Sequence, residues 1–141
     1  MEGETSNPFF SIVTVSHNAV DTLPQTVESV AGQSEKDWEH IIVDGASSDG
    51  TIEYLKSLSD TVKWISEPDD GIYHAMNKGI AMARGEVIAF LNADDVYFPQ
   101  TLEMVRKAFV DDADVVYGNL RKERFLAGRW YHRFEKPNSS D

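Results

Sequence analysis

The chain has 141 residues, 41% of them hydrophobic, a formal net charge of −11 and no cysteine. This composition fits a globular protein with a sizeable core, and it excludes disulfide bonds and thiolate metal sites. The acidic balance argues against binding to nucleic acid or to an anionic membrane, and it means that a phosphorylated ligand needs a cation or backbone amides. No apolar run is long enough to span a membrane and no secretory signal is visible, so we expect a cytoplasmic protein.

Strand and helix patterns alternate along most of the sequence, between a polar lead-in over 1–8 and a polar tail over 136–141. The expected elements are a strand over 9–15, a helix capped by Thr22 and ended by Gly32, a strand over 38–43, a helix over 51–58, a strand over 62–66, a helix from Ile72 that ends at Gly85, a strand over 87–91, a helix over 100–110 and a strand over 114–117. Residues 119–134 predict a hairpin or edge strand, with a turn at Ala127-Gly128. This order predicts one α/β domain over 9–135, a three-layer α/β/α fold with a mostly parallel, Rossmann-like sheet.

Polar residues follow the predicted strands where each strand ends. Ser16-His17-Asn18 follows the first strand, and Asn92, Asp94 and Asp95 follow the buried strand over 87–91. In open α/β sheets ligands bind outside the carboxyl ends of the strands, and Mg²⁺ and Mn²⁺ prefer carboxylate, water and phosphate oxygens. The pattern therefore indicates a divalent metal that holds a phosphorylated ligand, or else a solvated turn whose acidic side chains cap backbone amides.

Other polar residues have a structural and a functional interpretation. Asp44 ends the second strand, where it is either a turn residue or an acceptor for a ligand's imide N–H or hydroxyls. Capping explains Asp49, and the pair Asp69-Asp70 suits the start of a helix through the macrodipole. Asn77 lies in the middle of a helix, which makes a ligand or loop contact worth considering, whereas we expect Lys78 to be solvated.

Four ordered motifs resemble the N-terminal, nucleotide-binding half of family 2 glycosyltransferases with a GT-A fold. They lie at 11–18, 42–51, 71–79 and 83–95, and the likeness extends over about 10–118. The motif at 71–79 looks most like the branch that builds bacterial surface polysaccharides such as O-antigen. P-loop, dinucleotide-binding and α/β-hydrolase motifs are absent from the sequence.

The resemblance implies inverting transfer of a sugar from a nucleotide-diphospho-sugar, above all a UDP-sugar, to a saccharide or lipid-linked saccharide acceptor. Mn²⁺ or Mg²⁺ is the implied cofactor, and Asp94 in Asn92-Ala93-Asp94, a variant of the D-x-D motif, is the implied metal ligand. Asp44 matches the aspartate that contacts the nucleotide base, and Asp95 supports the metal or contacts the sugar. The residues expected at the donor are Ser16, His17, Asn18, Asp44, Asn77, Asn92, Ala93 and Asp95. Association with the inner face of the membrane and a homodimer are left open.

Two residues depart from the family pattern. Asn92 replaces the more common first Asp of the motif, and His74 stands where the related branch more often has Asp. An inverting transferase needs a general base, and no carboxylate lies in a matching motif, so we assign none and expect the acceptor half to be missing. The alternative is a non-catalytic donor-binding module. A receiver-like signalling domain is disfavoured because Ser16-His17-Asn18 stands where that fold needs an acidic pair.

Overall fold

A computed structural model describes residues 6–109, 114–116, 120–126 and 129–135. The chain divides into two compact units, residues 1–101 and 102–141. The expected domain boundaries, 9–135, remain a prediction. Within the described residues, no helix is long and apolar enough to cross a membrane.

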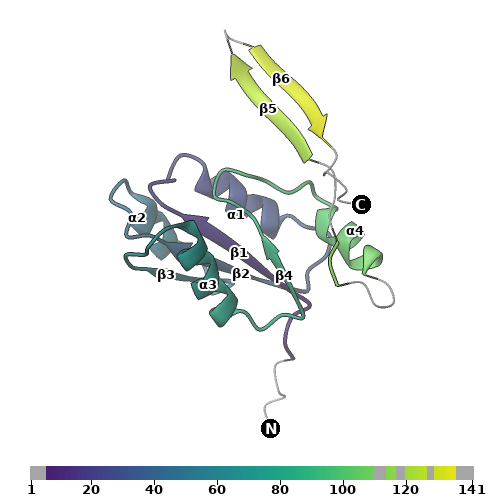
Figure 1. The fold of residues 1–141 in the computed structure, drawn as a ribbon, viewed down its shortest axis with the longest axis horizontal. Coiled ribbons are helices and arrows are strands. Elements are labelled where there is room, and N and C mark those ends of the chain that lie inside the picture. Colours follow the sequence, from purple (N-terminus) through teal and green to yellow (C-terminus); the bar gives the residue numbers. More distant parts are fainter. Residues whose placement is uncertain (1–5, 110–113, 117–119, 127–128, 136–141) are drawn as a thin grey trace. The chain divides into compact units, whose positions relative to one another are not determined.

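The first unit is built on a four-stranded parallel sheet with the order β3-β2-β1-β4 (Figure 1). The strands are β1 (Phe10–Ser16), β2 (Trp38–Asp44), β3 (Val62–Ser66) and β4 (Val87–Phe90). Their parallel pairing confirms the predicted class of sheet, and it brings the carboxyl ends of all four strands to one edge. In the register, Ser16 pairs with Asp44, and Asp44 pairs with Ser66.

Helices cover both faces of this sheet and give the predicted three layers. The helices of the first unit are α1 (Leu23–Ala31), α2 (Thr51–Lys56) and α3 (Ile72–Met82). On one face Leu23 of α1 and Leu55 of α2 pack with Ile42 of β2. On the other face Ala75 of α3 packs with Ile41 and Val43. The central strands β1 and β2 are buried on both faces, so apolar side chains occur on both faces, beside the buried polar residues Ser11, Thr14, Glu39 and His40.

The amino-terminal half of the sheet is held together by one buried carboxylate. The Glu39 side chain is 7% exposed and accepts hydrogen bonds from Ser11 Oγ (2.6 Å), Arg84 N (2.7 Å) and Lys63 Nζ (2.9 Å). Burial raises the pKa of Glu39, but these hydrogen bonds outweigh it and lower the pKa from 4.5 to about 2. The ionised form of Glu39 therefore stabilises the fold.

Glu39 predicts a loss of stability in acid. Because its pKa is lower in the folded than in the unfolded chain, its contribution is complete above pH 4.5 and is lost as the pH falls toward 2. We expect Glu39→Gln to lower the free energy of unfolding at pH 7 by roughly 2–3 kcal/mol and to flatten the fall in stability below pH 4.5, as urea unfolding at several pH values will measure. Glu53→Gln, at an exposed position of α2, is the control. A Glu39→Gln variant with the wild-type pH profile contradicts this role.

The second unit contains most of α4 (Thr101–Ala108) and the strands β5 (Leu120–Leu126) and β6 (Arg129–Glu135). The two strands pair antiparallel, which confirms the predicted hairpin, and the expected turn at Ala127-Gly128 lies outside the described residues. The strand predicted over 114–117 is wrong for 114–116, which have no regular structure, and Tyr117 is not among the described residues. Val115 is 78% exposed, so this short apolar run lacks the burial that stabilises a strand.

Candidate functional site

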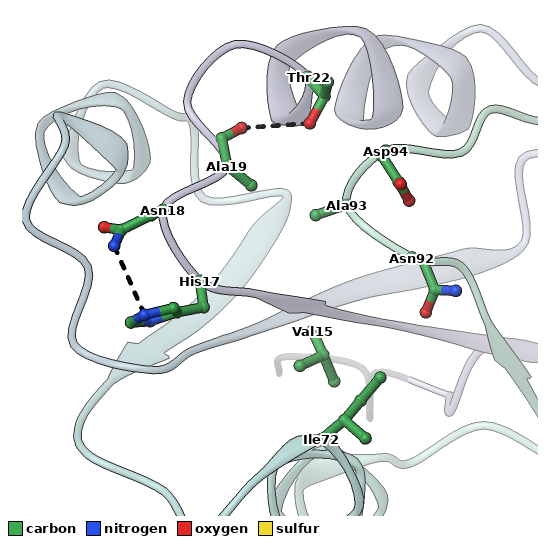
Figure 2. A pocket seen from close by; sticks show the side chains of 9 residues that line it. All are labelled: Val15, His17, Asn18, Ala19, Thr22, Ile72, Asn92, Ala93 and Asp94. Atoms are coloured by element: carbon green, nitrogen blue, oxygen red, sulfur yellow. Dashed lines mark hydrogen bonds between the residues drawn. The ribbon is translucent and has the colours of Figure 1, made fainter. Parts of the chain in front are cut away.

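An open pocket of about 420 Å³ lies at the carboxyl ends of β1 and β4. Figure 2 shows His17 and Asn18, which follow β1, on one side of it, and Asn92 and Asp94, which follow β4, on the other. The structure thus brings together residues about 75 positions apart that the sequence analysis selected separately. The complete lining is Val15, His17, Asn18, Ala19, Thr22, Ile72, Asn92, Ala93 and Asp94.

Asp44 is fully buried behind this edge and does not line the pocket. Its carboxylate accepts hydrogen bonds from Ser16 Oγ (2.8 Å), Ser66 Oγ (2.8 Å) and both N (2.9 Å) and Oγ (2.6 Å) of Ser47. Burial raises the pKa of Asp44, but these four hydrogen bonds outweigh it and hold the pKa below its ordinary value. Asp44 and Ser16 therefore join the ends of three strands, and their contacts with a nucleotide remain predictions.

The Asp44 network fixes the loop that carries His17 and Asn18. Ser47 Oγ accepts a hydrogen bond from Asn18 N (2.7 Å), and Asn18 Oδ1 accepts one from Ser48 N (2.8 Å). These bonds hold Asn18 at a φ of 49°, a left-handed conformation that asparagine tolerates. His17 Nδ1 lies 2.9 Å from Gly45 O, and because a carbonyl only accepts, Nδ1 carries the hydrogen. His17 is thus fixed in position and tautomer.

Asp49 supports the same loop from the other side, as expected for a structural residue. Its carboxylate accepts hydrogen bonds from Thr51 N (3.0 Å), at the start of α2, and from Val20 N (3.1 Å). The hydrogen bond from the Thr51 hydroxyl is the largest cause of the lowered pKa of Asp49. Gly50 rather than Asp49 is the N-cap residue of α2, and it makes no side-chain capping bond, so the Asp49 carboxylate acts from one residue earlier and links α2 to the segment that follows β1.

The acidic group after β4 sits on a well-anchored turn. Thr26 Oγ1 of α1 donates to the carbonyl oxygens of Ala93 (3.0 Å) and Asp95 (2.7 Å), and the Ala93 side chain packs into the core beside α1. The side chains of Asn92, Asp94 and Asp95 are left exposed. Burial and the nearby charge of Asp94 raise the pKa of Asp95, against a hydrogen bond from Asn92. Two neighbouring carboxylates that repel each other favour a bound cation.

The donor set fits a hard divalent metal that is shared with a ligand. No group of three or more His, Cys, Asp or Glu side chains in the described part of the chain is arranged to hold a metal by itself. Mg²⁺ typically binds through one or two carboxylates and completes its coordination with water and phosphate oxygens. Asp94, with Asn92 and Asp95 beside it, offers that kind of partial site.

The structure gives the environments of three residues of α3, and that of Lys78 differs from the expected one. Asn77 is exposed and does not line the pocket. Lys78 is not solvated as predicted, because its side chain is 17% exposed and its Nζ contacts Glu67 Oε1 (2.9 Å) and Pro68 O (3.0 Å). His74 Nδ1 accepts a hydrogen bond from Asp70 N (2.8 Å), as an aspartate at that position also can. Lys78 and His74 therefore hold the loop before α3.

The model for the glycosyl transferase family 2 matches residues 11–140. The chain belongs to this family. It is 35% identical over 138 residues to a PGL/p-HBAD biosynthesis glycosyltransferase of Mycobacterium bovis, which covers 91% of this chain and 52% of the relative. It is 44% identical over 93 residues to an uncharacterized glycosyltransferase of Mycobacterium tuberculosis, and this match covers 64% of this chain and 36% of the relative. It is 39% identical over 100 residues to the putative teichuronic acid biosynthesis glycosyltransferase TuaG of Bacillus subtilis, and this match covers 68% of this chain and 40% of the relative.

Solved structures show the same fold at lower identity. The mannosyltransferase PcManGT from Pyrobaculum calidifontis, in complex with GDP-Man and Mn²⁺, matches with a TM-score of 0.69 at 23% identity over 77% of this chain and 34% of that one. Staphylococcus aureus TarS 1–349, in complex with UDP-GlcNAc, matches with a TM-score of 0.65 at 22% identity, over 70% of this chain and 30% of that one. The family 2 chain therefore has the GT-A fold that its motifs predicted, and it spans about half or less of the length of these curated relatives.

Proposed function

We propose that this family 2 chain binds the donor of a glycosyltransferase that moves a sugar from a nucleotide-diphospho-sugar to an acceptor hydroxyl with inversion. The observation that carries the proposal is the pocket in which His17 and Asn18 face Asn92 and Asp94 across the carboxyl ends of β1 and β4. A UDP-sugar is the favoured donor. The relatives named for PGL and teichuronic acid biosynthesis support a role in surface polysaccharide synthesis.

The metal side of the pocket suits the donor's diphosphate. Asp94 is the proposed ligand of Mn²⁺ or Mg²⁺, with Asn92 and Asp95 beside it. When bound, the metal offsets negative charge on the diphosphate leaving group. A cation at this place offsets the repulsion between a bare diphosphate and the carboxylates of a chain with a net charge of −11.

The other side of the pocket suits the nucleoside. His17 and Asn18 are held by Ser47 and Gly45, and Ser47 is held by Asp44, so these side chains are fixed before a ligand arrives. Such preorganisation reduces the ordering cost of binding.

The proposed acceptor is a saccharide or a lipid-linked saccharide, which the protein reaches at the cytoplasmic face of the membrane. A homodimer is part of the same proposal.

A melting screen tests donor binding. We expect UDP with Mn²⁺ to raise the melting temperature, because a ligand at about 100 times its Kd stabilises the folded state by roughly 2.7 kcal/mol. The screen compares UDP, GDP and dTDP, each with Mn²⁺ and with EDTA. If none of them shifts the melting temperature in the presence of metal, the donor proposal is refuted.

A second candidate is a non-catalytic donor-binding module whose acceptor site comes from another chain. The chain spans 36–52% of the length of the curated relatives, and no general base is assigned within it. It predicts nucleotide-sugar binding without transfer or donor hydrolysis. Turnover of a nucleotide-sugar by the purified 141-residue chain eliminates this candidate.

A further inference from the structure

Asp44 is poorly placed to recognise a ligand in this structure. Its carboxylate is fully buried and already accepts four hydrogen bonds, from three serine side chains and one backbone amide. A direct bond to a nucleobase therefore requires Asp44 to give up part of this network. Breaking a hydrogen bond of this network is unfavourable, because the buried serine or amide group that loses its partner is also out of contact with water.

A different carboxylate, that of Asp69 in the loop before α3, approaches the end of β2 beside His17, which lines the pocket, although Asp69 itself is not among the lining residues. A Cβ atom built on Gly45, the residue after Asp44, would lie 2.9 Å from Asp69 Oδ2 and 3.4 Å from His17 Nδ1. The Asp69 carboxylate thus occupies the space that a side chain at position 45 would fill, next to His17 of the pocket. Because Gly45 has no side chain, the Asp69 carboxylate and the His17 ring both border the same small space at the end of β2.

Asp69 is held firmly in this position by its loop. Its Oδ1 atom accepts a hydrogen bond from Gly71 N (3.1 Å), while its Oδ2 atom has no hydrogen-bond partner among the described residues. The residues on either side are also fixed, since Glu67 N donates to Asp44 O (3.0 Å) and Lys78 Nζ donates to Pro68 O (3.0 Å). One oxygen of Asp69 is therefore structural, and the other is free to accept from a ligand.

We propose that Asp69 Oδ2 recognises the donor's nucleobase by accepting its ring N–H, and that Asp44 is a positioning residue behind it. The inference rests on the proposed donor site. An ionised carboxylate only accepts hydrogen bonds, so it suits uracil, thymine or guanine, each of which carries a ring N–H. Cytosine presents a bare nitrogen at the corresponding place, which a carboxylate oxygen repels. The site therefore distinguishes UDP, dTDP or GDP from CDP.

Calorimetric titration of the whole chain with UDP and CDP, both with Mn²⁺, tests this assignment. We expect wild type to prefer UDP, and Asp69→Asn to weaken UDP binding about tenfold and to remove the preference over CDP, because the amide keeps its oxygen on Gly71 N and presents an N–H₂ group to the base. Gly45→Ala should act in the same direction by displacing Asp69 Oδ2. Gly45 does not have a left-handed φ, so this substitution causes no backbone strain.

Asp70→Asn is the matched control, because the Asp70 side chain is 97% exposed on the same loop, and it should leave both affinities unchanged. The inference is overturned if Asp69→Asn keeps the wild-type ratio of UDP to CDP affinity. It is also overturned if Asp44→Asn loses UDP selectively at an unchanged free energy of unfolding. If wild type binds GDP or dTDP instead of UDP, the ratio of that nucleotide's affinity to the CDP affinity is compared between wild type and the variants in the same way. If wild type binds no nucleotide, the donor proposal itself fails.

Discussion

Asp94→Ala is expected to abolish the metal dependence of nucleotide binding. In wild type, Mn²⁺ should strengthen binding of UDP, and in the variant the affinity with Mn²⁺ should fall to the level measured in EDTA. The reason is that Asp94 lines the pocket from the β4 side with an exposed carboxylate. The described residues contain no group of three or more His, Cys, Asp or Glu side chains that could hold a metal in its place. With UDP at about 100 times its Kd, the variant should lose up to roughly 2.7 kcal/mol of the stabilisation that the ligand gives to the folded wild-type chain.

The measurement is a pair of melting curves for each variant, one with UDP and Mn²⁺ and one with UDP and EDTA. Asp60→Ala removes an exposed acidic residue outside the pocket and serves as the control for the change in net charge. We expect Asp60→Ala to keep the wild-type response to Mn²⁺. An Asp94→Ala variant that also keeps it refutes the assignment of Asp94 as the metal ligand.

Gly85→Ala is expected to destabilise the fold by about 3 kcal/mol, through overpacking against a backbone that cannot move aside. A Cβ on Gly85 would lie 2.7 Å from Phe10 C, Ser11 N and Ser11 Oγ. Phe10 and Ser11 are fully buried in β1, between β2 and β4. The substitution also disturbs the bond from Gly85 N to Ser11 Oγ (2.8 Å), the same hydroxyl that donates to Glu39. Urea unfolding followed by circular dichroism measures the loss.

Gly32→Ala is the control for the change from glycine to alanine. The nearest neighbour of a Cβ on Gly32 is Glu28 O at 3.3 Å, at the end of α1, so we expect a change within about 1 kcal/mol. Equal stability of the Gly85→Ala and Gly32→Ala variants contradicts the proposed close packing of the turn before β4 against β1.

The order of elements in the first unit was predictable because each has a strong local signal. β1 and β2 are rich in apolar, mostly β-branched residues, and α3 repeats its apolar residues with helical spacing. The meeting of the segments after β1 and β4 was also predictable, since parallel strands end at one edge. The strand prediction failed over 114–116 because a short apolar run alone does not show what covers it.

The environment of each site residue was not predictable, because it depends on contacts distant in sequence. No spacing connects Asp44 with Ser66, which meet only through the register of β2 and β3. Asp69 approaches Gly45 because the loop before α3 is fixed by Lys78, a residue that its sequence position alone assigned to solvent. The hydrogen bond from Gly71 N, just before α3, accounts for Oδ1 of Asp69, and only the structure shows where Oδ2 lies.

Titration of the wild-type chain with UDP, GDP and dTDP, each measured once with Mn²⁺ and once with EDTA, tests whether the pocket between the ends of β1 and β4 binds a nucleoside diphosphate together with a metal. We expect saturable binding of at least one nucleotide, above all UDP, that is markedly weaker in EDTA. Absence of binding by all three nucleotides with Mn²⁺ contradicts the claim.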